Sequence, residues 1–347
     1  MEFFVGIDVS LDSASICVVD ERGVIIKEGK CASEPDAIAR FIRHKGRRIE
    51  HVGLETGSLS QWLHAGLTRE GFRVTVMEAC HVRASLATMR IKTDRNDARG
   101  IAQLVRLGWF KAVHVKTPTA QEARALLGAR QFLVDKVTAV ENSMRAALRN
   151  FGLKMGPVTR PKWPARAREL AGGNQALESV VEALLRVREA LLEELRAFDR
   201  KLLETARADP VVRTMMTAPG VGAIVALTFK SAVDDPDRFR KARDVGPWLG
   251  LTPSRYQSGQ VDRRGRTTQA GDAGVRAMLY EAASTLLGRV SRWSAIKAWG
   301  LRLARRSGAK KARVAVARKL AVILLSMWKA DQPFRWARQP GGDPAMA

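Results

Sequence analysis

At residues 92–98 the chain reads Lys92-Thr93-Asp94-Arg95-Asn96-Asp97-Ala98. Two carboxylates therefore lie three residues apart at the start of a predicted helix over about 94–108. Residues at positions i and i+3 share one helix face, so both carboxylates can point to one spot. One interpretation is that they hold a divalent metal against a nucleic-acid phosphate. The other is that acids in a first turn simply complement the helix dipole.

The overall charge favours an anionic partner. The 347 residues include 59 Lys+Arg against 35 Asp+Glu, a net charge of +24, and 46% are hydrophobic. The length and the hydrophobic fraction indicate packed cores in two or three domains. The positive charge indicates a polyanionic partner, either nucleic acid or an anionic membrane surface. No apolar run reaches transmembrane length, and no signal-peptide pattern is present. The three cysteines lack metal or redox spacing, so we expect a cytoplasmic protein that binds nucleic acid and no membrane.

The first part of the chain predicts an α/β domain. Three strands with short connections, at 3–10, 13–20 and 24–31, indicate an antiparallel meander. Helices and strands then alternate, with a helix at 36–45, a strand at 49–55, a helix at 59–70, a strand at 73–78 and the helix that carries Asp94 and Asp97.

Two more acids belong to the apolar strands of this domain. Asp8 lies inside a strand, where a carboxylate is costly unless it is paired or binds a metal. Glu55 lies at the carboxyl end of a strand, where open sheets usually carry their sites. A solvated strand end for Asp8 and a helix cap for Glu55 are the alternatives. The order of strand-Asp, meander, strand-Glu and helix with Asp-x-x-Asp favours one shared metal site.

These motifs resemble a known family. Gly6-Ile7-Asp8-Val9-Ser10, Gly53-Leu54-Glu55-Thr56-Gly57 and the 92–98 stretch are similar to the DEDD motif of a RuvC-like (RNase H-like) nuclease domain. The version they resemble is that of the one-ten/one-eleven-eleven family of insertion-sequence transposases. The resemblance implies that Asp8, Glu55, Asp94 and Asp97 are catalytic and bind Mg²⁺, an ion that prefers such hard oxygen ligands.

The middle of the chain predicts two long helices. One begins near Thr117 and the other spans about 174–208, each with a narrow apolar stripe at steps of three and four. Residues 152–173, which contain three prolines, predict a loop between them. We interpret the helices as a coiled-coil arm for oligomerisation, and an ordinary bundle is the alternative.

The turn Pro219-Gly220-Val221-Gly222 resembles a helix-hairpin-helix, whose backbone N–H groups bind a DNA phosphate. A plain turn between helices is the alternative. Residues 248–276 then form a polar, Gly-rich and basic segment before a predicted helix at 275–287, and such a segment suits phosphate binding. Our candidate nucleic-acid contacts are Lys92, Arg95, Gly220, Gly222, Arg255, Arg263, Arg264, Arg266 and Arg276.

A serine in this segment could attack phosphorus. All five histidines lie in the first third of the chain, so a Ser-His-Asp triad is not indicated. The segment resembles the C-terminal domain of the same transposases, whose nucleophilic serine lies in the Ser-Gly pair that corresponds to Ser258-Gly259 here. Ser254 is the alternative nucleophile, and a turn-forming or phosphate-contacting role is the alternative for Ser258. Residues 267–270 depart from the family pattern, which puts the contact at that point in doubt.

The resemblance implies a transposase, that is, a DNA recombinase in which Ser258 forms a covalent phosphoserine link. It also implies donor and target DNA, a guiding bridge RNA, and a homo-oligomer, dimer to tetramer, whose sites combine the acids of one subunit with the serine of another. The rival hypotheses are a metal-dependent nuclease of the junction-resolvase type, in which water attacks, and a non-enzymatic nucleic-acid-binding protein. The predicted fold is α/β plus α. Its parts are a RuvC-like domain at 1–115, the arm at 116–208, a mainly helical transposase domain at 209–335 and a disordered tail at 336–347.

Overall fold

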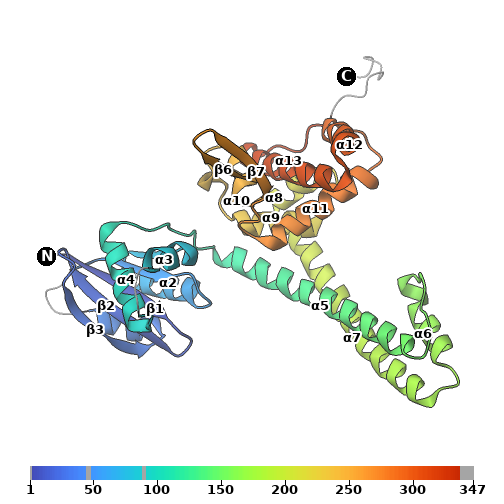
Figure 1. Cartoon of the computed structure of the whole chain (residues 1–347), viewed down its shortest axis with the longest axis horizontal. Helices are drawn as coiled ribbons and strands as arrows, with labels where there is room; N and C mark the ends of the chain where they lie inside the picture. Colours follow the sequence, from blue (N-terminus) through green and yellow to red (C-terminus); the bar gives the residue numbers. More distant parts are fainter. Residues whose placement is uncertain (1, 44–47, 88–90, 337–347) are drawn as a thin grey trace. The chain divides into compact units, whose positions relative to one another are not determined.

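The computed structural model describes residues 2–43, 48–87 and 91–336. The chain divides into two compact units, Met1–Lys116 and Thr117–Ala347 (Figure 1). The further division of the second unit at residue 208 stays a prediction. The predicted disordered tail lies outside the described residues, except for Trp336. Within residues 2–43, 48–87 and 91–336, every helix is too short or too polar to span a bilayer.

The N-terminal unit is built on a five-stranded sheet with the order β3-β2-β1-β4-β5. Strand β2 pairs antiparallel with β1 and β3, whereas β4 pairs parallel with β1 and β5. The predicted meander and alternating α/β pattern are therefore confirmed. The strands are β1 (Glu2–Val9), β2 (Ser13–Asp20), β3 (Ile25–Ala32), β4 (Arg48–Glu55) and β5 (Val74–Met77).

Helices cover both faces of this sheet. The alternation of side chains along β1 sends Val5 and Ile7 to one face, where they share a core with α1 (Pro35–Ile42) and α2 (Ser60–Arg69). The opposite face carries α3 (Ala79–Leu86) and α4 (Asp94–Leu107), which pack on Met77, Cys17 and Val19. Helix α4 begins and ends within a residue of its prediction, whereas α3 was not predicted.

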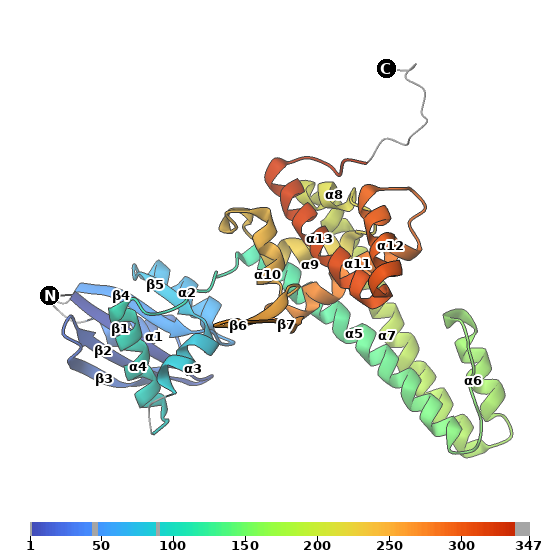
Figure 2. The same cartoon turned by 45° about the horizontal axis from the view of Figure 1, so that its top comes forward.

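The second unit begins with two long helices, α5 (Pro118–Arg149) and α7 (Gln175–Ala208). They run antiparallel, because Arg130 pairs with Asp199 while Glu141 pairs with Arg188 further along (Figure 2). The predicted loop at 152–173 is wrong in part, since it contains η1 (Arg160–Lys162) and α6 (Trp163–Ala171). The prolines of this segment predict a break in helical structure. Pro164 instead lies in the first turn of α6, where the missing N–H costs nothing.

The rest of this unit is a helical bundle with a short hairpin. Its main core joins side chains of α7 to those of helices α8 (Pro210–Met216), α9 (Ala223–Val233), α10 (Val245–Trp248), α11 (Ala273–Gly288) and α13 (Ala309–Ala330). Helix α12 (Ala295–Ser307) adds Ile296, and η2 (Pro236–Arg238) and η3 (Ala242–Asp244) connect α9 to α10. Strands β6 (Pro253–Ser258) and β7 (Val261–Thr267) form an antiparallel hairpin where the sequence predicted only a polar loop.

Asp272 ties the start of α11 to α5. Its carboxylate accepts a hydrogen bond from the Val275 N–H at 3.1 Å and another from the Arg124 guanidinium at 2.8 Å. Burial acts to raise the pKa of Asp272, but the hydrogen bonds from Arg124 and the backbone hold that pKa below its ordinary value. The carboxylate therefore stabilises the fold above the pKa of the unfolded chain, and this stabilisation is lost as the pH falls through the lower pKa of the folded protein.

We expect Asp272→Ala to lower the free energy of unfolding by about 1–2 kcal/mol at neutral pH, because a helix cap and a partly exposed ion pair are lost together. Urea denaturation measures this change. Asp237→Ala is the control, since the Asp237 side chain is 87% exposed and its contact with Lys329 is long at 3.4 Å. Equal losses in the two variants would contradict the capping role.

Candidate active site

Two of the predicted acids lie at the same level, at the carboxyl ends of neighbouring strands. Strands β1 and β4 are parallel and pair Ile7 with Leu54, so Asp8 and Glu55 follow together at their carboxyl ends. Both side chains are half-buried. This edge of the sheet is where open α/β sheets place their sites, as the sequence analysis expected.

Two glycines bring α4 against the same face. A Cβ at Gly6 would lie 2.2 Å from the Ala102 nitrogen and 2.3 Å from the Ala98 oxygen, and a Cβ at Gly53 would lie 2.2 Å from a Val105 methyl group. Gly6 and Gly53 each lie two residues before an acid, so Asp8 and Glu55 share the face on which α4 packs.

The first turn of α4 carries the other two acids along that face. Asp94 lies one turn before Ala98, which contacts Gly6, and Asp97 lies one turn before Ile101 on the Gly53 side. Thr93 caps the helix by accepting a hydrogen bond from the Asn96 N–H at 3.2 Å. The structure therefore brings all four predicted acids to one edge of the N-terminal unit.

We expect Gly6→Ala to lower the free energy of unfolding by about 2–4 kcal/mol, because the new methyl group would overlap backbone atoms of α4 and not the end of a flexible side chain. Chemical denaturation of the full chain, followed by signals from the N-terminal unit, measures this. Gly57→Ala is the matched control, since a Cβ at Gly57 meets nothing within 4 Å. A Gly6→Ala protein as stable as the control would show that α4 does not need this close approach.

The electrostatics of these acids indicate a shared site. Burial, followed by repulsion from Asp97 and Asp94, raises the pKa of Asp8. Burial, followed by repulsion from Asp8 and Asp97, raises the pKa of Glu55. The Lys30 ammonium lies 2.9 Å from an Asp94 carboxylate oxygen, and this hydrogen bond lowers the pKa of Asp94.

Helix-dipole complementation explains acids in a first turn, but it does not explain Asp8 and Glu55, which lie on strands. Among the described residues, neither carboxylate has a hydrogen bond or an ion pair with a protein side chain. Half-buried carboxylates that repel one another are stabilised by a bound cation. The arrangement therefore favours the metal-site interpretation over the dipole interpretation.

A divalent metal fits this site by its chemistry. All four groups offer the carboxylate oxygens that Mg²⁺ and Mn²⁺ prefer. In residues 2–43, 48–87 and 91–336, however, no three His, Cys, Asp or Glu side chains are close enough together to hold a metal as they stand. The ion pair with Lys30 uses one carboxylate oxygen of Asp94 and leaves the other oxygen available to a cation.

Two charged residues of β3, Glu28 and Lys30, pair with α4 beside this site and were not predicted from the sequence. Glu28 pairs with Arg99 at 2.8 Å and also with Arg95, which we had predicted as a nucleic-acid contact. Lys92, the other contact predicted in this unit, is exposed. Lys30 and Glu28 lie more than sixty positions from α4 in the chain, and only their alternation along a strand facing α4 could have indicated these pairs.

Ser258 ends strand β6 in the second unit. It pairs with Val261 across a two-residue turn in which Gly259 has a φ of +54°, a conformation that favours glycine. The serine is exposed at the hairpin tip, and its hydroxyl has no hydrogen-bond partner in the described part of the chain. Ser254, by contrast, donates its hydroxyl to the Arg266 carbonyl oxygen at 3.1 Å. The geometry therefore favours Ser258 over Ser254 as the freely accessible hydroxyl.

The predicted basic contacts fall into two groups. Arg255 pairs with Asp262 across the hairpin through two contacts of 2.8 Å, and Arg276 donates to the carbonyl oxygens of three residues between 249 and 271. These two guanidiniums support the local structure. The side chains of Arg263, Arg264 and Arg266 are exposed on β7. Tyr256, which the sequence analysis passed over, is 70% exposed on the same hairpin.

The two glycines of the predicted helix-hairpin-helix turn have different surroundings. Gly220 has a φ of +79°, and a Cβ there would lie 2.5 Å from the Ala282 oxygen, so this glycine is needed for packing against α11. Gly222 is the N-cap of α9, and a Cβ there would meet nothing within 4 Å. Only Gly222 leaves the helix start open to a ligand, while Gly220 fits the alternative of a plain turn.

Comparison with known proteins identifies the class. A family model described as "Transposase IS116/IS110/IS902 family" matches residues 212–299, and a DEDD transposase model of the IS110 type, described as "Transposase", matches residues 5–152. The transposase for insertion sequence element IS1111A of Coxiella burnetii is 26% identical over 338 residues, which are 95% of this chain and 90% of that protein.

Two further relatives agree. The protein y4pF/y4sB of Sinorhizobium fredii is 30% identical over 257 residues, covering 72% of this chain and 65% of the relative. The transposase for insertion sequence element IS1328 of Yersinia enterocolitica is 25% identical over 255 residues, covering 70% and 74%. The chain is thus a transposase-class enzyme that acts on DNA. It belongs to the IS110/IS1111 family of DEDD transposases.

Proposed function

We propose that the protein cuts and rejoins the DNA of an insertion sequence, with Asp8, Glu55, Asp94 and Asp97 binding Mg²⁺ and Ser258 attacking the scissile phosphate. The observation that carries the proposal is the gathering of the four acids at one sheet edge, where burial and mutual repulsion raise the pKa values of two of them. The order of the sheet, an antiparallel meander followed by parallel strands, supports the RuvC-like interpretation.

The acids have a binding role. They would hold Mg²⁺, which when bound neutralises charge on the phosphate oxygens and stabilises the transition state of phosphoryl transfer. Lys30, which pairs with Asp94, would supply a positive charge beside the acids for a phosphate of the DNA backbone. Asp8 and Glu55, whose pKa values are raised first by burial and then by repulsion among the acids, would be stabilised in their charged forms by a bound divalent cation.

Ser258 has the covalent role. Its hydroxyl oxygen forms a bond to phosphorus, the bond from phosphorus to the departing sugar oxygen breaks, and that oxygen takes up a proton as the serine loses one. The product is a phosphoserine ester that keeps one phosphodiester-type bond, so a hydroxyl of a second strand can reverse the step and join a new strand. The exposed position of Ser258 at the hairpin tip supports this role.

The family resemblance extends the proposal to partners. A bridge RNA pairs with donor and target DNA, and the protein acts as an oligomer, dimer to tetramer, in which acids and serine come from different subunits. The helix pair of α5 and α7 supports an oligomerisation arm, since it exposes the apolar side chains of Phe132, Val180 and Val187. The net charge of +24 supports the polyanionic partners.

One observation favours a rival function. All four acids belong to the N-terminal unit, and no histidine is present in the second unit to activate Ser258. A metal-dependent nuclease would need only the acids and a water molecule as the nucleophile. A purely nucleic-acid-binding protein is less well supported, because carboxylates facing phosphate weaken binding unless a metal lies between them.

The test is a recombination assay with purified full-length protein, Mg²⁺, RNA transcribed from the element's flanks and labelled donor and target DNA. We expect joined donor–target products that require Mg²⁺ and disappear in EDTA. Cleaved DNA without joined products would favour the nuclease. DNA binding with neither cleavage nor joining under any divalent metal would favour the non-enzymatic protein.

A further inference from the structure

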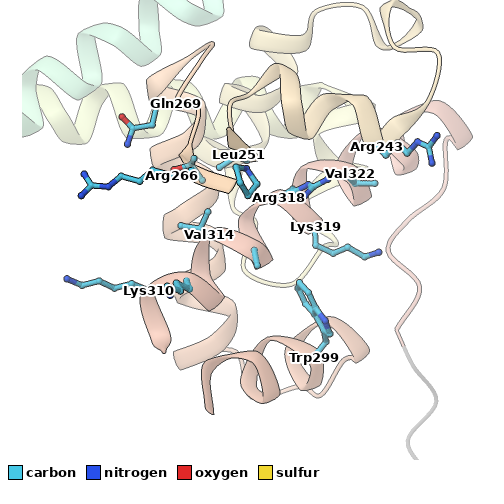
Figure 3. A pocket seen from close by; sticks show the side chains of 15 residues that line it. Arg243, Leu251, Arg266, Gln269, Trp299, Lys310, Val314, Arg318, Lys319 and Val322 are labelled. Atoms are coloured by element: carbon cyan, nitrogen blue, oxygen red, sulfur yellow. The ribbon is translucent and has the colours of Figure 1, made fainter. Parts of the chain in front are cut away.

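The C-terminal unit also contains a basic cavity beside the β6–β7 hairpin. A cavity of about 870 Å³ lies between the β6–β7 hairpin, α12 and α13 (Figure 3). Its apolar wall includes Leu251, Val314 and Val322, and Trp299 of α12 contributes an indole that is 38% exposed. A cavity of this size accepts a ligand of one or two rings with their substituents.

The charged part of the lining is entirely cationic. It includes six basic side chains and no carboxylate, and the six are Arg243, Arg266, Lys310, Lys311, Arg318 and Lys319. Within the described residues, none of the six has an ion pair or a side-chain hydrogen bond, unlike Arg255, which Asp262 neutralises. In the view of Figure 3 the side chains of Arg266 and Lys310 extend outward on the same side, away from the apolar wall.

We propose that this cavity binds an unpaired nucleotide of a single-stranded DNA segment, with the base against Trp299 and the flanking phosphates on the basic rim. An apolar wall with one exposed aromatic ring fits a nucleobase, and six cations without partners fit consecutive phosphates. A duplex keeps its bases stacked inside, so the base has to be extruded or already single-stranded.

The position of the cavity identifies the strand as DNA. Pro253, Gly265 and Arg266 of the hairpin form part of its lining, and the same hairpin carries Ser258 at its tip. The proposal thus rests on the proposed function, in which Ser258 attacks a DNA strand. A base held in the cavity fixes the register of that strand relative to the serine, which makes Trp299 a positioning residue.

The test measures fluorescence anisotropy of a labelled twelve-nucleotide oligo-dT with full-length protein in EDTA, where no cleavage occurs. Trp299→Ala should weaken binding by about 5- to 100-fold, and Trp299→Phe should keep most of the affinity. Trp62→Ala is the matched control, because Trp62 is 43% exposed in α2 of the N-terminal unit. Lys310→Ala combined with Lys311→Ala should reduce the slope of log affinity against log salt by about 1.4, since each phosphate contact on a single strand contributes roughly 0.7.

A second comparison uses the same oligonucleotide with abasic positions. Loss of the bases should weaken binding to the wild-type protein but not to Trp299→Ala. Equal affinity of wild type and Trp299→Ala for oligo-dT would overturn the proposal, and so would a Trp299-dependent preference for oligo-U RNA, which would assign the cavity to an RNA strand. Because the assay needs no chemistry, a protein that fails to recombine DNA but shows the Trp299 effect would overturn the proposed function and leave the cavity assignment in place.

Discussion

Asp8→Asn and Glu55→Gln should each reduce DNA cleavage by at least about a hundredfold, because each removes a charge from the group of acids proposed to bind the metal. Affinity for DNA in EDTA should stay the same or rise, since a negative charge near phosphate is lost. Both quantities are measured with the same labelled substrate, by gel for cleavage and by anisotropy for binding. The asparagine and glutamine variants preserve side-chain shape, so the loss reports charge.

Stability provides an independent readout for these variants. The pKa of Asp8 is higher in the folded protein than in the unfolded chain, so at a pH between these two values the folded protein binds more protons. The charged Asp8 carboxylate therefore destabilises the metal-free fold as the pH rises through the range between the two pKa values. Asp8→Asn should therefore unfold at the same or a higher temperature than the wild type in EDTA.

Asp36→Asn is the control, because Asp36 is also an acid in a first helical turn of this unit, on α1. It should leave cleavage unchanged. If Asp8→Asn cleaved DNA as well as Asp36→Asn does, the four acids would not form a metal site, and dipole complementation would be sufficient for Asp94 and Asp97.

Ser258→Ala should abolish joining and lower the yield of covalent protein–DNA adduct by at least about a thousandfold, since the nucleophile itself is removed. Ser254→Ala is the matched control on the same strand. It loses one hydrogen bond to the Arg266 carbonyl oxygen and should keep activity within about tenfold. Adduct is measured on a denaturing gel and joining by amplification across the new junction.

The same assays also show whether Ser254 or a water molecule is the nucleophile. Loss of adduct in Ser254→Ala but not in Ser258→Ala would assign the nucleophile to Ser254. Undiminished cleavage in Ser258→Ala would indicate that water attacks, and the metal-dependent nuclease would replace the recombinase.

Much of the N-terminal unit could be predicted from the sequence, because β1, β2 and β4 are rich in apolar residues and short polar or Gly-containing connections separate the first three strands. Asp8 and Glu55 were found because an acid in such a strand is costly and conspicuous. Their coming together was also predictable, since parallel neighbouring strands end at one edge. The pairing of Lys30 with Asp94 was not predictable, because it depends on the contact of β3 with α4 across sixty-four positions.

The C-terminal unit was harder to predict. The β6–β7 hairpin exposes nearly every side chain, so it lacks the apolar alternation by which a strand is recognised. Helix α6 was hidden by prolines that mark its beginning. The basic cavity is assembled from η3, the hairpin, α12, α13 and two connecting residues, and no single stretch of sequence contains its pattern.

The nucleophile is identified most directly by finding the residue that carries DNA after cleavage. Purified protein would be incubated with Mg²⁺, RNA from the element's flanks and a suicide DNA substrate that blocks rejoining, then digested with protease and nuclease for mass spectrometry. We expect a nucleotide bound to the peptide that contains Ser258. Efficient cleavage with no nucleotide on any peptide, or with the nucleotide on another residue, would contradict this expectation.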